Sequence, residues 1–223
     1  MILAIDTSTQ WMGIAIYSDE QILYEKVWKT NRRHTVELSP AIQSAFAECG
    51  ESISKLEVVA VALGPGSFTS LRIGLAVAKG LALSLHIPVI GIPSLDVMAA
   101  CQPIKDMPLI CVLKIGRERL AACNYKASAQ SWVVDGEIYT ASALELENRI
   151  QSPTLICGEI DAEDRKILER RWRNAIIAQP ANNTRRPAQL AQLAAEKLRA
   201  NLINDVVSLA PIYVHTINSP SMP

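Results

Sequence analysis

The sequence is poor in residues that mark several protein classes. It has 10 Gly among 223 residues, and Lys plus Arg equals Asp plus Glu at 22 each, so the net charge is zero. So little Gly excludes a collagen-like chain, and 49% hydrophobic residues without net charge exclude a disordered one. A neutral chain has no overall electrostatic attraction for nucleic acid or an anionic membrane. We therefore expect a packed globular protein whose contacts with charged partners are local.

The sequence also lacks motifs for metal binding and nucleophilic catalysis. The five cysteines contain no C-x-x-C pair, which argues against a zinc ribbon and gives no disulfide framework. His34 and Glu37 are too few ligands for a metal, and neither H-E-x-x-H nor H-x-x-x-H occurs. No G-x-S-x-G elbow surrounds Ser67. We predict no metal site and no catalytic residues.

A long uninterrupted apolar run is missing too. The most apolar stretch, residues 71–92, is broken by Arg72, Lys79, His86 and Pro88, and the first five residues carry no basic segment. We expect a cytoplasmic protein that makes no contact with a membrane.

The apolar patterns that are present predict an α/β fold. Strands are predicted over 2–7, 11–17, 22–28, 56–63 and 89–92, a helix that starts between Thr35 and Ser39 and ends at Cys49, and a second from Ser67 to Leu85. After Pro108 the pattern restarts, with strands over 109–115, 120–126, 132–134, 154–157 and 175–178 and helices over 141–150, 161–173 and 187–201. We predict two lobes, 1–103 and 104–223, with the final helix 187–201 able to pack back on the first lobe.

The segment from Gly64 to Gly74 is the most informative in the chain. A strand, a Gly-Pro-Gly turn and a helix start expose backbone N–H groups at the positive end of a helix dipole, which favours an anion. Together with the carboxylate and hydroxyls that follow the first strand, the candidate anion or nucleotide site comprises Asp6, Thr7, Gly64, Gly66, Ser67 and Thr69. The alternative is a pair of tight turns without a ligand, because neither G-x-x-x-x-G-K-[ST] nor G-x-G-x-x-G is matched.

The helix over 71–85 is apolar nearly all round, with small residues along it. Such a helix is covered on more than one face, either deep in its own lobe or against a partner. The helix over 38–49 adds an amphipathic stripe beside it. The candidate partner-binding residues are Leu38, Ile42, Ala45, Phe46, Leu71, Leu75, Ala76, Ala78 and Ala82.

Basic residues gather over 165–173, with Arg185 and Arg186 nearby. They could contact phosphate, but Glu163, Asp164 and Glu169 are interleaved among them. The mixed signs favour a solvated helix face.

Several of these segments resemble the TsaB family, bacterial partner proteins in the synthesis of N6-threonylcarbamoyladenosine in tRNA. The resemblance lies in ILAIDTST at 2–9, His34, GPGSFTSLRIG at 64–74, Ala78-Lys79-Gly80-Leu81-Ala82, Pro88 with Ser94-Leu95, and Pro211-x-Tyr213. It is dense over residues 1–100. Departures are Ser70, where the family usually has Gly, and Lys114 to Ala121, where it reads roughly D-A-R-x-x-E-V-Y.

The resemblance implies two ribonuclease-H-like lobes of the actin and Hsp70 type, without catalytic activity of their own. It implies pairing of the first two helices with those of a TsaD-type catalytic subunit, which modifies adenosine 37, and assembly with a TsaE-type ATPase. The chain alone would form a homodimer through the same surface and would meet tRNA only indirectly. It would require no cofactor, with ATP or ADP and Mg entering the complex through partner subunits. Alternatives are a small kinase or ATPase of the same superfamily and an M22-like metallopeptidase.

Overall fold

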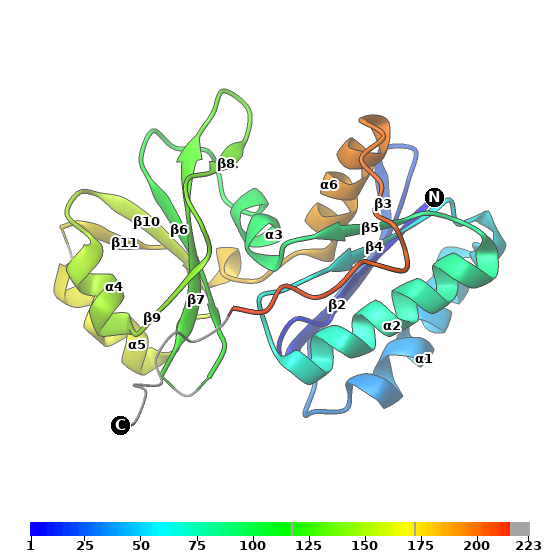
Figure 1. Ribbon diagram of the computed structural model, residues 1–223, viewed down its shortest axis with the longest axis horizontal. Coiled ribbons are helices and arrows are strands. Elements are labelled where there is room, and N and C mark those ends of the chain that lie inside the picture. Colours follow the sequence, from blue (N-terminus) through cyan, green and yellow to red (C-terminus); the bar gives the residue numbers. More distant parts are fainter. Residues whose placement is uncertain (117, 172, 215–223) are drawn as a thin grey trace.

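A computed structural model describes residues 1–116, 118–171 and 173–214, which form two sheets with helices on both faces of each (Figure 1). The first sheet has strand order β3-β2-β1-β4-β5. Its strands are β1 (Ile2–Asp6), β2 (Trp11–Ser18), β3 (Gln21–Lys29), β4 (Val58–Ala62) and β5 (Val89–Ile92). Strand β1 is antiparallel to β2 and parallel to β4, so the carboxyl ends of β1, β4 and β5 meet at one edge.

Side chains that alternate along β1 build two cores on the first sheet. Leu3 and Ile5 face α1 (His34–Cys49) and α2 (Phe68–Leu85), which lie side by side. Ile2 and Ala4 face α6 (Pro187–Arg199) on the other side. Alanines on both the sheet and α6 let this helix approach closely: Ala4, Ala15, Ala60, Ala191 and Ala194 are all buried there. The last helix of the chain is thus part of the first lobe.

The second sheet has order β11-β10-β6-β7-β8, with β9 paired to β7. Its strands are β6 (Leu109–Lys114), β7 (Leu120–Ala127), β8 (Trp132–Val134), β9 (Tyr139–Ala141), β10 (Thr154–Gly158) and β11 (Ala175–Ile177). Helices α4 (Ala143–Arg149) and α5 (Ala162–Leu168) cover one face, and α3 (Ser94–Ala100) covers the other. Short 3-10 turns lie at Ile53–Lys55, Glu169–Arg171 and Pro180–Asn182.

Helix α3 joins the lobes. It packs on the second sheet through Leu95, Met98 and Ala99 and also contacts α6 of the first lobe (Figure 1). Between the lobes, the Tyr125 hydroxyl donates to Asp96 Oδ1 at 2.7 Å. The sequence did not predict α3, because seven residues are too short to display a helical period.

Several predicted boundaries differ from the structure. The helix predicted over 141–150 starts later, because Ala141 pairs in β9 and Ser142 forms a capping box with Glu145. The helix predicted over 161–173 ends at Leu168 and continues as the turn Glu169–Arg171, while residue 172 lies outside the described residues. Residues 215–223 of the predicted second lobe also lie outside them.

The segment after α6 returns along α2 (Figure 1). Asn204 bridges to β5, the Ile212 N–H donates to the Leu63 carbonyl at 2.7 Å, and Lys79 Nζ donates to the Val207 carbonyl at 3.0 Å. At the start of α2, Arg72 lies 3.7 Å over the Phe68 ring and donates to the Tyr213 hydroxyl at 2.8 Å. This segment therefore covers one flank of α2.

Candidate functional site

The loop after β1 and the loop between β4 and α2 touch, as the candidate anion site requires. Thr7 Oγ1 donates to the Ser70 carbonyl at 2.7 Å, and the Ser67 N–H donates to the Ser8 carbonyl at 2.7 Å. A Cβ on Gly66 would overlap the Ser8 backbone oxygen, so only glycine permits this approach. The six predicted residues thus come from two loops that meet at the sheet edge.

Several polar groups of these two loops already have partners within the chain. The Gly64 N–H donates to Ser94 Oγ at 3.0 Å, and Ser8 Oγ lies 2.6 Å from the same oxygen. Ser67 occupies the N-cap position of α2, but its side chain makes no capping hydrogen bond, contrary to the expected hydroxyl cap. Of the predicted site residues, Ser67 and Thr69 are exposed.

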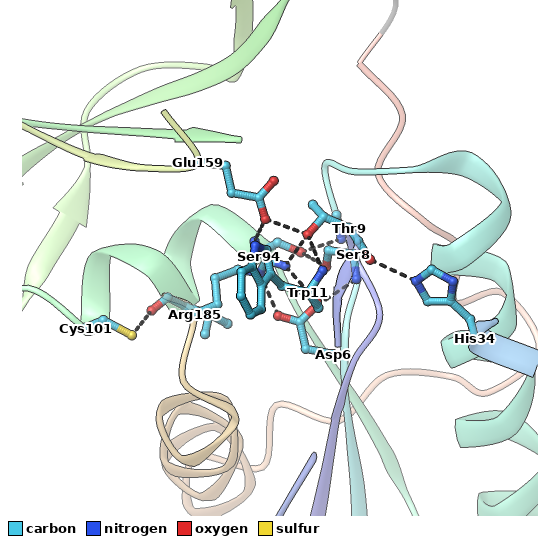
Figure 2. Close-up of polar contacts among 11 residues, drawn as sticks. Asp6, Ser8, Thr9, Trp11, His34, Ser94, Cys101, Glu159 and Arg185 are labelled. Atoms are coloured by element: carbon cyan, nitrogen blue, oxygen red, sulfur yellow. Dashed lines mark hydrogen bonds and ion pairs between the residues drawn. The ribbon is translucent and has the colours of Figure 1, made fainter. Parts of the chain in front are cut away.

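Asp6 is paired with a buried arginine from the far end of the chain (Figure 2). Arg185 Nε donates to Asp6 Oδ2 at 2.7 Å, and Arg185 Nη1 donates to Glu159 Oε1 at 2.7 Å. The other Asp6 oxygen accepts from the Ser8 N–H at 2.8 Å. Thr9 Oγ1 donates to Glu159 Oε1 at 2.5 Å and accepts from Arg185 Nη2 at 3.0 Å. The cluster joins β1, the end of β10 and the segment before α6.

Arg185 is 4% exposed, so the prediction that it belongs to a solvated basic face is wrong. Burial by itself lowers the pKa of its guanidinium, but the carboxylates of Asp6 and Glu159 outweigh burial and raise it above the ordinary value. Its position follows from α6, which begins with Pro187 packed where a Cβ on Gly13 of β2 would lie. Arg186, the next residue, points outward and pairs with Glu25.

His34 and Glu37 both make hydrogen bonds within the first lobe. His34 is buried, with Nε2 2.8 Å from the Thr9 carbonyl (Figure 2). Trp28 Nε1 donates to Glu37 Oε2 at 2.9 Å. The bond from Trp28 lowers the pKa of the Glu37 carboxyl. Among residues 1–116, 118–171 and 173–214, no three His, Cys, Asp or Glu residues are grouped to hold a metal ion. His34 therefore fastens the start of α1 to the loop after β1.

Replacing His34 by Ala should destabilise the fold by about 1–3 kcal/mol, because the buried Thr9 carbonyl loses its donor. Urea unfolding followed by circular dichroism measures the change. Thr35→Ala, at an exposed position of the same turn, is the control and should unfold with the wild type. Equal midpoints for both variants would show that the His34 bond does not hold α1.

The structure corrects the predicted partner-binding residues. Eight of the nine point into their own lobe and are 9% exposed or less: Leu38, Ile42, Ala45, Phe46, Leu71, Leu75, Ala78 and Ala82. Their apolar periodicity is explained by the first sheet, against which both helices pack. Ala76 alone of the nine is exposed.

The outward side of the two helices consists of other residues. We call it the outer helix face: Val36, Pro40 and Gln43 of α1 with Phe68, Arg72, Ala76, Gly80 and Leu83 of α2. Val36 is 59%, Phe68 53% and Leu83 60% exposed. In the described part of the chain, α2 is also the one helix long and apolar enough to cross a membrane by length and composition, yet 33% of it is buried. The outer helix face therefore exposes three large apolar side chains, Val36, Phe68 and Leu83.

Comparison with known proteins identifies the family. A family model described as "TsaD: tRNA N6-adenosine threonylcarbamoyltransferase" matches residues 26–155. The tRNA threonylcarbamoyladenosine biosynthesis protein TsaB of Bacillus subtilis is 32% identical over 96% of this chain and 93% of its own. The chain belongs to the TsaB family. TsaB of Escherichia coli is 38% identical over 44% of this chain and 42% of its own.

A solved structure from Pseudomonas aeruginosa, titled as an uncharacterized protein similar to peptidase YEAZ, superposes with a TM-score of 0.80 at 19% identity. It covers 96% of this chain and 99% of its own. This likeness confirms the predicted α/β fold with two lobes. Membership of the TsaB family gives the chain a role in the threonylcarbamoyladenosine modification of tRNA.

Reasoning from sequence missed the residues that complete the cluster at Asp6. Arg185 is 179 positions from Asp6, and Glu159 lies in the second lobe, where the resemblance to the TsaB family is weakest. The available signal was an arginine just before a helix that begins with proline. That signal does not distinguish a buried guanidinium from an exposed one.

Proposed function

We propose that the chain is a non-catalytic partner that pairs with a TsaD-type catalytic subunit in threonylcarbamoylation of tRNA adenosine 37. The outer helix face is the proposed contact. A TsaE-type ATPase would complete the assembly in the cytoplasm, with ATP or ADP and Mg bound by the partner subunits. The chain would meet tRNA only through the complex, in keeping with its zero net charge.

The observation that carries this proposal is the uncovered side of α2. The large apolar side chains that α2 exposes are Phe68 and Leu83, whereas Ile73, Val77, Leu81 and Leu85 are partly buried against the core. Burial of one exposed Leu is worth about 1.5–3 kcal/mol, so Leu83 and Phe68 supply a driving force for association. Exposed aromatic and arginine side chains, such as Phe68, Tyr213 and Arg72, are typical anchors of protein interfaces.

Small residues on the same side support a helix-on-helix contact. Ala76 and Gly80 are one turn apart and exposed, and a Cβ on Gly80 would meet nothing within 4 Å. A glycine inside a helix costs about 0.5–1 kcal/mol relative to Ala. No contact among residues 1–116, 118–171 and 173–214 requires a glycine at position 80, whereas the close approach of a partner backbone would require one.

We propose that the same face pairs with itself when the catalytic subunit is absent. A two-fold dimer places the same patch of each copy in contact, which suits a hydrophobic helix pair. The metallopeptidase alternative has no ligand group among the described residues to support it.

Co-expression with the TsaD-type subunit tests the proposal. The expected result is a complex that survives gel filtration, and tRNA modification that requires both proteins. A dimer of this chain alone, which dissociates as the catalytic subunit is added, would agree with a shared surface. Full modification by the catalytic subunit with TsaE but without this chain would contradict the proposal. Phosphoryl transfer by this chain alone would favour the kinase alternative.

A further inference from the structure

The carboxylates of Asp6 and Glu159 resemble the ligands of a cation site, and the guanidinium of Arg185 occupies the position of the cation. Two carboxylates and the Thr9 hydroxyl converge at the carboxyl end of β1, and carboxylate and hydroxyl oxygens are the ligands that Mg²⁺ prefers. Both Asp6 oxygens already have partners, the Ser8 N–H and Arg185 Nε. A Mg-bound phosphate at this point would have to displace the guanidinium.

The guanidinium is bound as a ligand would be. Arg185 donates from Nε, Nη1 and Nη2, to Asp6, Glu159, Thr9 and the Trp11 carbonyl, and its side chain is 2% exposed. A planar fork bonded to two carboxylates is the arrangement that Arg, rather than Lys, forms well.

We propose that Arg185 is a built-in cation that takes the place of Mg–nucleotide between the lobes, so that the lobes are held together without a nucleotide. The residues present do not fit a Mg-bound nucleotide, whichever subunit the chain pairs with. The proposal therefore goes beyond the partner role and does not depend on it.

The same cluster reaches both helices of the outer helix face. Asp6 and Thr9 flank Thr7, which holds the first turn of α2 through Ser70, and the Thr9 carbonyl lies against His34 at the start of α1. A Cβ on Gly74 of α2 would overlap Thr7 Oγ1, so the loop and the helix are in close contact. Arg185 thus acts as a positioning residue: it fixes the loop after β1, which contacts the first turns of both helices.

The experiment compares two neighbouring arginines. Arg185→Gln leaves the buried Asp6 carboxylate and the half-buried Glu159 carboxylate without a counter-charge, and we expect its melting temperature to fall by about 10 °C. Arg186→Gln removes the ion pair between the exposed Arg186 side chain and Glu25, and it should change the melting temperature by about 2 °C or less. Adding Asp6→Asn and Glu159→Gln to Arg185→Gln should recover much of the loss, because the unpaired charges are gone. Equal melting of the two single variants would overturn the proposal.

Ligand titration tests directly whether the Arg185 guanidinium takes the place of Mg²⁺. Millimolar Mg²⁺, alone or with ATP, should leave the melting of the wild type and of Arg186→Gln unchanged, and calorimetry should detect no binding to the wild type. Mg²⁺ alone should raise the melting temperature of Arg185→Gln by several degrees, because the two carboxylates regain a cation. Micromolar Mg–ATP binding by the wild type, or no effect of Mg²⁺ on Arg185→Gln, would overturn the proposal.

A second variant covers the case in which Arg185→Gln does not fold. Arg185→Lys keeps the charge but loses the planar guanidinium fork and its donors at Nε, Nη1 and Nη2, so it should fold and melt below the matched Arg186→Lys. Melting at the wild-type temperature would contradict a role for the guanidinium fork. Co-purification with the catalytic subunit is measured separately, so loss of pairing in an outer-face variant does not affect these outcomes.

Discussion

Replacing Gly80 by Arg should leave the chain folded and abolish its pairing with the TsaD-type subunit. A Cβ at residue 80 would meet no atom of the described residues within 4 Å, so an exposed side chain can be added there, and Arg favours a helix more than Gly. In a dry helix contact, however, the same charge would be unpaired. A cost of about 3 kcal/mol weakens the pairing about a hundred-fold. Gel filtration of the co-expressed proteins and the tRNA modification assay measure it.

The matched variant is Ala78→Arg, two positions away on the inward side of α2. Ala78 is 0% exposed and lies in the core that α1 and α2 form with the first sheet. An arginine there should unfold the lobe, which circular dichroism would detect as a loss of helical signal. Ala76→Arg, at the exposed position, should behave like Gly80→Arg. If Gly80→Arg and Ala76→Arg remain folded, pair with the catalytic subunit and support modification at the wild-type level, the proposed partner surface is wrong.

Replacing Gly66 by Ala should destabilise the protein by about 3 kcal/mol or more. The added methyl would overlap the backbone oxygen of Ser8, and neither loop can retreat without breaking the bonds from Ser67 and Thr7. Because these loops position α2, pairing and modification should fall together with stability. Urea unfolding gives the free energy, and the modification assay gives the functional loss.

Gly80→Ala is the matched control for Gly66→Ala, because the same change occurs where space is open. It should raise the free energy of unfolding by about 0.5–1 kcal/mol, the opposite sign. A Gly66→Ala protein as stable as the wild type would show that the loops separate at little cost. The close approach would then be unnecessary for the fold.

The regular elements could be predicted well because their signals are local. Strands β1, β2 and β4 were recognised from apolar runs bounded by polar turns, and α2 from the break after β4. The short helix α3 and the strand β9 were missed, because each depends on neighbours distant in sequence. The same limit explains why the burial of Arg185 was not predicted. The local charge pattern is the same for Arg185, which is buried, and for Arg186, which is exposed.

The sequence by itself determined the two-lobed α/β class, the elements that carry the candidate site, and the resemblance to the TsaB family. The tertiary structure decided which face of each helix is outward. Because α2 is apolar nearly all round, its sequence does not show which side is buried; that side is set by packing on the first sheet. The tertiary structure also decided which group pairs with Asp6. Only folding brings Arg185 and Glu159 to Asp6, and a carboxylate as buried as that of Asp6 requires the counter-charge and hydrogen bond that Arg185 supplies.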